Sequence, residues 1–163
     1  MGCGKSKKGR KVANYLGLRF IDMDEWIENS ENKTIPEIFA QFGEDYFRQK
    51  EYEALLQICE IENTVVACGG GSPCYFNAID KMNDNGITVY LKASPAFLKD
   101  RLMQSKKKRP LIENLSTEEL LLYIEAKLKE REAYYEKAKL VVEAVACRSV
   151  ELADTVRSMQ RSA

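Results

Sequence analysis

The sequence of 163 residues contains no histidine, and this absence removes several kinds of chemistry. Without imidazole there is no Ser–His or Cys–His nucleophile pair, no His-ligated zinc and no histidine general base. An excess of charge is also missing, because 25 basic side chains balance 25 acidic ones. Such a balance is not typical of proteins that coat nucleic acid or an anionic membrane. Catalysis must therefore use carboxylates, lysine, arginine, cysteine or backbone amides.

The sequence also lacks cysteine pairs at metal-binding spacing. Its five cysteines are odd in number, lie far apart and include no Cys-x-x-Cys: Cys3, Cys59, Cys68, Cys74 and Cys147. This pattern argues against a disulfide framework or a thiolate zinc site, and it predicts small core residues in a reducing cytosol. No apolar run approaches the ~18 residues needed to cross a bilayer, and no signal peptide is evident. The sequence therefore predicts a cytoplasmic protein.

Short apolar segments alternate with segments of helical periodicity. Strands are predicted at residues 19–23, 64–68, 87–92 and 140–145. Helices are predicted to begin at Thr34, Ser94 and Ser116; the first ends at Gly43 and the last runs to about residue 139. This alternation is typical of βαβ units. It predicts a single α/β domain over residues 1–163, with a mainly parallel sheet covered on both faces.

The segment Gly2-Cys3-Gly4-Lys5-Ser6 matches the second half of a phosphate-binding loop, Gly-x-x-x-x-Gly-Lys-Ser/Thr, without the leading glycine. In such a loop the backbone amides surround phosphate, Lys5 reaches the terminal phosphates, and the hydroxyl of Ser6 binds Mg²⁺. A helix over about 5–16 would direct its positive end at the anion. The alternative is N-myristoylation at Gly2 with palmitoylation at Cys3, but no flexible basic arm follows.

Two carboxylates, Asp22 and Asp24, end the first predicted strand, where parallel sheets bind ligands. One can hold water on Mg²⁺ while the other orients a substrate hydroxyl, because alternate residues of a strand point to opposite sides. The alternative is structural, with Asp24 capping the next helix.

Three consecutive glycines, Gly69, Gly70 and Gly71, follow the second predicted strand. They cost conformational entropy and bring no side chain to the core. This favours the close approach of another group to the backbone over a simple turn.

Three basic features have both a structural and a functional interpretation. Arg48 and Glu51 at i and i+3 form either a surface ion pair or a preoriented anion site, and Arg131 is by default an exposed helix arginine. The cluster at 105–110, which contains Arg109, is either a nucleic-acid patch or a lid over ATP. The cluster is isolated and has no aromatic platform, which disfavours nucleic acid.

Together these segments resemble the shikimate kinases. The matching motifs occur in the family's order: Gly-x-Gly-Lys-Ser, Phe-Ile-Asp-x-Asp, Ile-Phe-x-x-x-Gly-Glu-x-x-Phe-Arg-x-x-Glu, Gly-Gly-Gly, Arg-Pro-Leu at 109–111 and Arg-x-x-x-Tyr at 131–135. The resemblance covers nearly the whole chain. It implies a P-loop kinase, a three-layer α/β sandwich whose parallel sheet has the order 2-3-1-4-5, with a lid at about 105–116. The implied reaction moves the γ-phosphate of ATP to the 3-hydroxyl of shikimate, a step of chorismate and aromatic amino acid biosynthesis.

The resemblance also implies an ATP site with Mg²⁺. Its phosphate contacts are Gly2, Cys3, Gly4, Lys5 and Ser6. By the same resemblance Ser6 ligates Mg²⁺ and Asp22 holds water on it, Arg109 reaches the transferring phosphate, and Arg101 lies over the adenine.

The same resemblance implies a shikimate site. Asp24 binds the shikimate hydroxyls and acts as the base, completing a catalytic set with Lys5 and Arg109. The shikimate carboxylate is clamped by Arg48 and Arg131, and Glu51 holds Arg48 in place. Amides for substrate and phosphate come from Gly69, Gly70 and Gly71.

Two departures from the family pattern bear on these expectations. The family has a strand and a glycine before the position of Met1, so we expect a sheet without its central strand and a natural start roughly ten residues earlier. Lys7 and Lys8 also stand where the family has a small hydroxyl residue and an apolar one. The alternative is therefore a non-catalytic relative that binds a ligand or partner. Gluconate and adenylate kinases are disfavoured because they lack this set of motifs. The resemblance implies a monomer.

Overall fold

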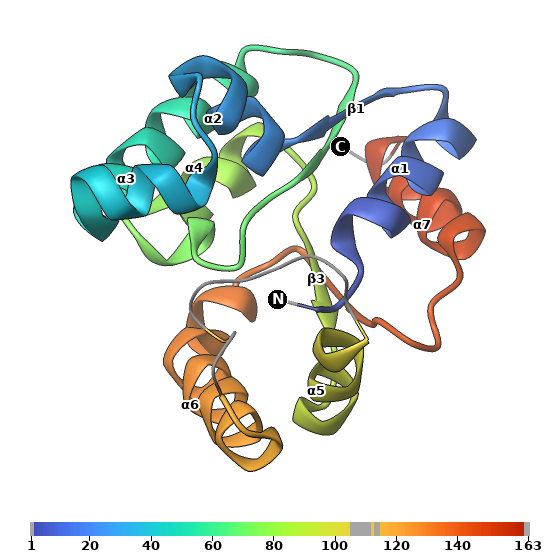
Figure 1. The fold of residues 1–163 in the computed structure, drawn as a ribbon. Coiled ribbons are helices and arrows are strands. Elements are labelled where there is room, and N and C mark those ends of the chain that lie inside the picture. The colour runs from blue at the N-terminus through green and yellow to red at the C-terminus, as the bar shows by residue number, and fades with distance from the viewer. Residues whose placement is uncertain (1, 105–111, 113–114, 162–163) are drawn as a thin grey trace.

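The computed structural model describes residues 2–104, 112 and 115–161. The elements in chain order are α1 (Lys5–Leu16), β1 (Arg19–Asp22), α2 (Met23–Glu31), α3 (Ile35–Cys59), β2 (Thr64–Ala67), the 3₁₀ turn η1 (Ser72–Cys74), α4 (Ala78–Asn85), β3 (Val89–Lys92), α5 (Pro95–Met103), α6 (Thr117–Tyr135), β4 (Leu140–Glu143) and α7 (Ser149–Arg161) (Figure 1). Strands and helices alternate as the sequence predicts, so the α/β class is confirmed.

The strands form two parallel pairs. β1 pairs with β2, with Arg19 opposite Thr64, and β3 pairs with β4, with Val89 opposite Leu140. Within the described residues β2 and β3 are not paired with each other, so the parallel sheet is divided into two halves. β2 and β3 each keep one edge without a strand partner within the described residues.

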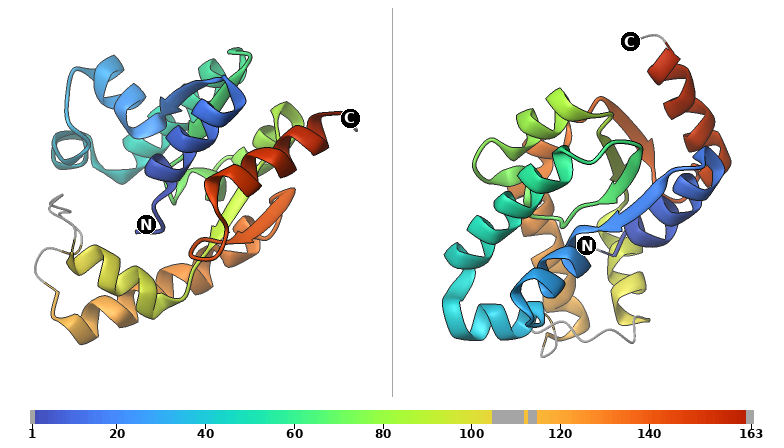
Figure 2. Two further views of the ribbon diagram at one scale, coloured as in Figure 1. Left: turned by 90° about the vertical axis from the view of Figure 1, so that its right-hand side faces the viewer. Right: turned by 90° about the horizontal axis from the view of Figure 1, so that it is seen from above.

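Helices cover both faces of these strands. α1 and α7 lie side by side, and their buried Val12 and Leu152 pack with Val65 of β2 and Val89 of β3 (Figures 1 and 2). The next residue along β2, Val66, packs on the opposite face against the core of α2, α3 and α4. This alternation follows from the two-residue period of a strand. A further cluster joins α5 to α6.

Capping chemistry explains where two long helices begin. Thr34 and Glu37 form a complete capping box at α3, and Ser116 and Glu119 form another at α6, both as predicted. Gly43 does not end its helix, however. Its φ of 79° breaks the helical path, and helical geometry then resumes. This break sets the direction of the second half of α3, which carries Arg48.

Several boundaries differ from the sequence prediction. Each strand is shorter than expected; the first stops at Asp22 because the side chain of Asp22 caps α2. α6 ends at Tyr135 rather than near residue 139. α4 and α7 were not predicted; the N-cap of α4, Asn77, has a φ of 55° and makes no side-chain cap hydrogen bond.

The positions of the cysteines agree in part with the prediction of core residues, because four of the five pack against a hydrophobic cluster. All five cysteines are free and half-buried. Cys59 and Cys68 pack against the α2–α4 core, Cys3 against the α5–α6 cluster and Cys147 against α1 and α7.

Within the described residues, every helix is too short or too polar to serve as a membrane span.

Candidate active site

The carboxyl ends of β1 and β2 bring the phosphate loop and the acidic motif together. Ser6, in the first turn of α1, donates a 2.5 Å hydrogen bond from its hydroxyl to Oδ2 of Asp22, the last residue of β1. Parallel sheets place ligands beyond the carboxyl ends of their strands. A hydroxyl and a carboxylate at this edge are the hard oxygen donors that suit Mg²⁺, which binds few protein groups and keeps phosphate and water. These two residues therefore fit the implied metal.

Asp24 lies beside Lys5 but not on the strand. Asp22 accepts a hydrogen bond from the backbone amide of Asp24, so Asp22, not Asp24, caps α2. The expectation that both carboxylates lie on one strand is therefore wrong, because the chain becomes helical at Met23. The carboxylate of Asp24 is half-buried, 3.7 Å from the ammonium of Lys5. A carboxylate and an ammonium thus share one space.

Arg48 and Glu51 form a buried pair rather than a surface one. Arg48 Nη1 donates to Glu51 Oε2 at 2.7 Å, and the hydroxyl of Ser72 donates to Glu51 Oε1 at 2.6 Å. Burial opposes the charged form of Arg48, but the carboxylates of Glu51 and Glu44 outweigh it and raise the pKa of Arg48. Glu51 is thereby fixed from both sides and holds the guanidinium in one position. The role expected for Glu51 is consistent with this geometry.

The triple glycine packs against these side chains. A Cβ on Gly69 would lie 2.6 Å from Glu51 Oε1, and a Cβ on Gly71 would lie 2.4 Å from Arg48 Nη1. Neither glycine has a positive φ, so space and not backbone conformation requires glycine here. The sequence predicted a close approach to this backbone, and the approaching groups include the site's own Arg48 and Glu51.

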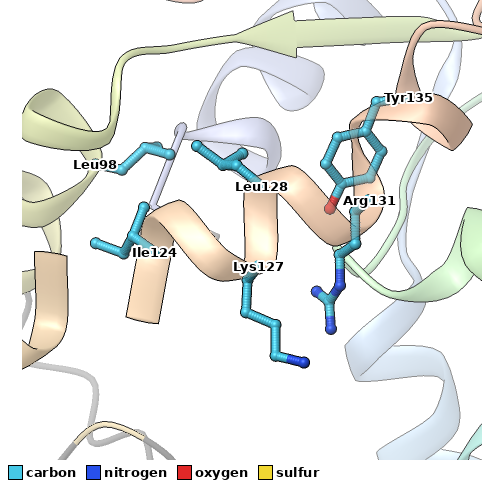
Figure 3. A pocket seen from close by; sticks show the side chains of 6 residues that line it. All are labelled: Leu98, Ile124, Lys127, Leu128, Arg131 and Tyr135. Carbon is cyan, nitrogen blue, oxygen red and sulfur yellow. The ribbon is translucent and has the colours of Figure 1, made fainter. Parts of the chain in front are cut away.

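Arg131 comes from α6, on the other side of the site. It lines a pocket between α5 and α6 together with Leu98, Ile124, Lys127, Leu128 and Tyr135 (Figure 3). Its Nε is buried and, within the described residues, has no hydrogen-bond partner. A buried guanidinium nitrogen with an open donor is suited to an anionic ligand.

Tyr135 links α6 to the glycines. Its hydroxyl donates a 2.5 Å hydrogen bond to the carbonyl of Gly70. Burial raises the pKa of Tyr135 to about 12, against the opposing positive charge of Arg131, so the hydroxyl remains a donor at neutral pH.

Arg48 and Arg131 act on a common neighbour. Burial raises the pKa of the Cys74 thiol, while the positive charges of Arg131 and Arg48 oppose that rise. Cys74 belongs to the 3₁₀ turn that follows the glycines. The two arginines therefore approach the same turn from α6 and α3.

The expected nucleotide contacts of the phosphate loop lie against α5. A Cβ on Gly4 would lie 3.4 Å from Arg101 Nη2, so the exposed Arg101 of α5 reaches the phosphate loop. Gly2 and Gly4 both have positive φ and Cys3 packs against the α5–α6 cluster. Arg109 and most of the predicted lid lie outside the described residues.

The two lysines that depart from the family pattern do not enter the site. Lys7 is exposed on α1, and the ammonium of Lys8 donates to the carbonyl of Cys147. Neither places an additional cation beside Asp22 or Asp24.

Comparisons with known proteins show the family of this chain. The profile of the shikimate kinases matches residues 1–160. The chain belongs to the shikimate kinase family. It is 44% identical over 139 residues to the shikimate kinase of Phocaeicola vulgatus, covering 85% of this chain and 79% of that one. It is 42% identical over 141 residues to the shikimate kinase of Flavobacterium johnsoniae, covering 85% and 82%.

Solved shikimate kinases share the fold. The crystal structure of shikimate kinase from Bacteroides thetaiotaomicron matches with a TM-score of 0.88 and 34% identity, covering 99% of this chain and 93% of that one. Shikimate kinase from Acinetobacter baumannii, in complex with shikimate, matches with a TM-score of 0.86 and 31% identity, covering 99% and 89%. The expected three-layer P-loop kinase fold is therefore confirmed.

Sequence reasoning missed three residues of the site. Ser72, Tyr135 and Glu44 each bond to a predicted site residue or to the glycine loop, yet none was assigned a role. Glu44 and Tyr135 do stand inside the motifs Gly-Glu-x-x-Phe-Arg and Arg-x-x-x-Tyr, so their positions carried a signal. For Ser72, the only sequence signal was its position directly after the three glycines.

Proposed function

We propose that this chain transfers the γ-phosphate of ATP to the 3-hydroxyl of shikimate, giving shikimate 3-phosphate and ADP. The observation that supports this proposal best is the buried Arg48–Glu51 pair beneath Gly71, with Asp24 and Lys5 at the next strand end. An arginine held in place by a buried carboxylate is preoriented for a second, exchangeable carboxylate. Shikimate carries a carboxylate and vicinal hydroxyls.

On the donor side, the phosphates of ATP would lie on the amides of Gly2–Ser6 at the N-terminus of α1, with Lys5 at the terminal phosphate. Ser6 and Asp22 would hold Mg²⁺, which neutralises phosphate charge when it is bound. Arg101 would lie at the nucleotide, and Arg109 would contact the transferring phosphate as the family resemblance implies.

On the acceptor side, Arg48 and Arg131 would bind the carboxylate and so orient the ring. Asp24 would then accept the proton of the 3-hydroxyl while the hydroxyl oxygen forms its bond to the γ-phosphorus. The bond from that phosphorus to the bridging oxygen breaks, and ADP leaves with the electron pair. Lys5 stabilises the charge that spreads over the phosphoryl oxygens. Amides of Gly69, Gly70 and Gly71 would complete the acceptor contacts.

The reaction is tested by following ADP release in a coupled assay with shikimate present and absent, and by identifying shikimate 3-phosphate as the product. Lys5→Met is expected to lower turnover roughly 10²-fold or more, because a charge aimed at the transferring phosphate is lost. Lys7→Met is the matched control, since Lys7 is exposed on the same helix. Shikimate binding without turnover in the unaltered chain would instead favour a non-catalytic relative.

We further propose that the enzyme acts as a monomer in the cytoplasm, and that neither nucleic acid nor a membrane is its partner. The family resemblance supports the monomer, and the balanced charge and the free cysteines support the other assignments.

A further inference from the structure

Arg48 binds two carboxylates, and only one of them is buried. Glu51 accepts from Nη1 at 2.7 Å, whereas Oε1 of Glu44 accepts from both Nε at 3.1 Å and Nη2 at 2.8 Å. The side chain of Glu51 is 4% exposed and that of Glu44 is 54% exposed. The Nε–Nη2 edge of a guanidinium is one of the edges that bind carboxylates in bidentate fashion. Glu44 therefore occupies a ligand-binding edge of the proposed acceptor arginine.

The two carboxylates differ in their freedom to leave Arg48. Glu51 is held by the hydroxyl of Ser72 and packs under Gly69. Glu44 follows directly after Gly43, where the helical path of α3 is broken. Apart from Arg48, its partner is the hydroxyl of Tyr75 at a long 3.4 Å. When Glu44 moves, the buried group that loses its bonds is Arg48, which the arriving carboxylate then binds.

Lys127 of α6 adds a positive charge near Glu44, and its ammonium is itself paired with Glu130 Oε2 at 2.6 Å. The hydrogen bond from Arg48 lowers the pKa of Glu44, and the charge of Lys127 adds to this effect. Lys127 also lines the pocket with Arg131, and Figure 3 shows both side chains extending from α6. A carboxylate that leaves Arg48 can thus turn toward Lys127, where it would share the ammonium with Glu130.

We propose that Glu44 is a resident substitute for the acceptor carboxylate. It neutralises the Nε–Nη2 edge of Arg48 while the site is empty and exchanges with the carboxylate of shikimate on binding. This inference rests on the proposed function. Two carboxylates on the same edge would repel each other, so acceptor binding displaces the exposed one. Glu44 therefore weakens acceptor binding, and it favours acceptors with a full negative charge because a neutral group replaces it poorly.

The test is calorimetric titration of the full chain with shikimate, before and after Glu44→Gln. We expect the variant to bind shikimate about fivefold more tightly, because the competitor on Arg48 changes from a charged to a neutral acceptor. Glu44→Ala is expected to change the affinity in the same direction. The matched control is Glu53→Gln, which removes another half-exposed carboxylate of α3, one paired with Lys50. It is expected to leave shikimate affinity unchanged.

A double-mutant cycle with Lys127→Met tests where Glu44 goes. We expect the loss of Lys127 to weaken shikimate binding more in the wild-type background than beside Glu44→Gln. Equal effects in both backgrounds would overturn the movement toward Lys127. Weaker or unchanged shikimate binding by Glu44→Gln would overturn the exchange itself, and weaker binding would make Glu44 a positioning residue for Arg48. If the wild-type chain binds no shikimate at all, the proposed function fails instead.

Discussion

The hydroxyl of Tyr135 donates a 2.5 Å hydrogen bond to the carbonyl of Gly70, joining residues 65 positions apart. Gly70 lies between the two glycines that pack on Glu51 and Arg48, and Tyr135 lies one helical turn after Arg131. The bond therefore fixes the distance between the α6 side of the acceptor site and its α3 side. Since Arg48 and Arg131 are proposed to hold the same carboxylate, this distance bears directly on binding.

Tyr135→Phe is expected to lower kcat/KM for shikimate while the KM for ATP stays near its wild-type value. It leaves the Gly70 carbonyl without its donor, which costs about 1–3 kcal/mol of stability. Steady-state kinetics and thermal unfolding check both effects. Tyr134→Phe is the control, because Tyr134 is exposed on the same helix. A variant of Tyr135 that matches this control in both measurements would contradict the role of the bond.

Gly71→Ala is expected to damage the acceptor site. The new Cβ would lie 2.4 Å from Arg48 Nη1, so the guanidinium or the loop must shift. Overpacking of this kind costs roughly 1–3 kcal/mol, and weaker shikimate binding should accompany it. Gly86→Ala serves as the comparison, since its φ is −173° and the nearest neighbour, Met82 O, is 3.9 Å away. Normal shikimate affinity in Gly71→Ala would show that Arg48 can bind from a displaced position.

Arg48→Ala and Arg131→Ala are both expected to weaken shikimate binding by on the order of 2–5 kcal/mol, with ATP binding little changed. They should differ in stability. Loss of Arg48 leaves the buried Glu51 without its cation, which costs about 3–5 kcal/mol, whereas the described contacts of Arg131 include no ion pair. Calorimetry with each ligand and thermal unfolding separate the two effects. Equal losses for ATP and shikimate would refute the assignment of both arginines.

Asp24→Asn is expected to lower turnover roughly 10²–10⁴-fold while the unfolding temperature stays close to that of the wild type. Asp24 does not cap α2, and its partly exposed ion pair with Lys5 contributes little stability. Near-normal turnover in this variant would mean that the proton of the acceptor hydroxyl goes elsewhere.

Asp22 combines a helix cap with the proposed Mg²⁺ site, and two substitutions separate these roles. Asp22→Asn keeps a good N-cap but loses the charge, so stability should hold while more Mg²⁺ is needed for half-maximal turnover. Asp22→Ala loses both, at a cost of about 1 kcal/mol of stability. An unchanged Mg²⁺ dependence in Asp22→Asn would exclude Asp22 from the metal site.

Local signals in the sequence predicted the starts of α1, α3, α5 and α6 correctly. The capping boxes at Thr34 and Ser116 need only residues three positions apart, so no tertiary contact is required to recognise them. The alternation of strands and helices is local in the same way, and it determined the fold class. The family resemblance then joined motifs that are individually weak.

Only the tertiary structure decided how these residues meet. Whether Arg48 is a surface or a buried arginine depends on Gly71, which lies against its guanidinium, and on Ser72, which bonds to its partner Glu51. The use of Asp22 rather than Asp24 as the cap depends on where β1 stops pairing with β2. The bond between Tyr135 and Gly70 needs α6 to pack across the glycine loop. Contacts of this kind come from burial and packing between distant segments, and the periodicity of one segment does not contain that information.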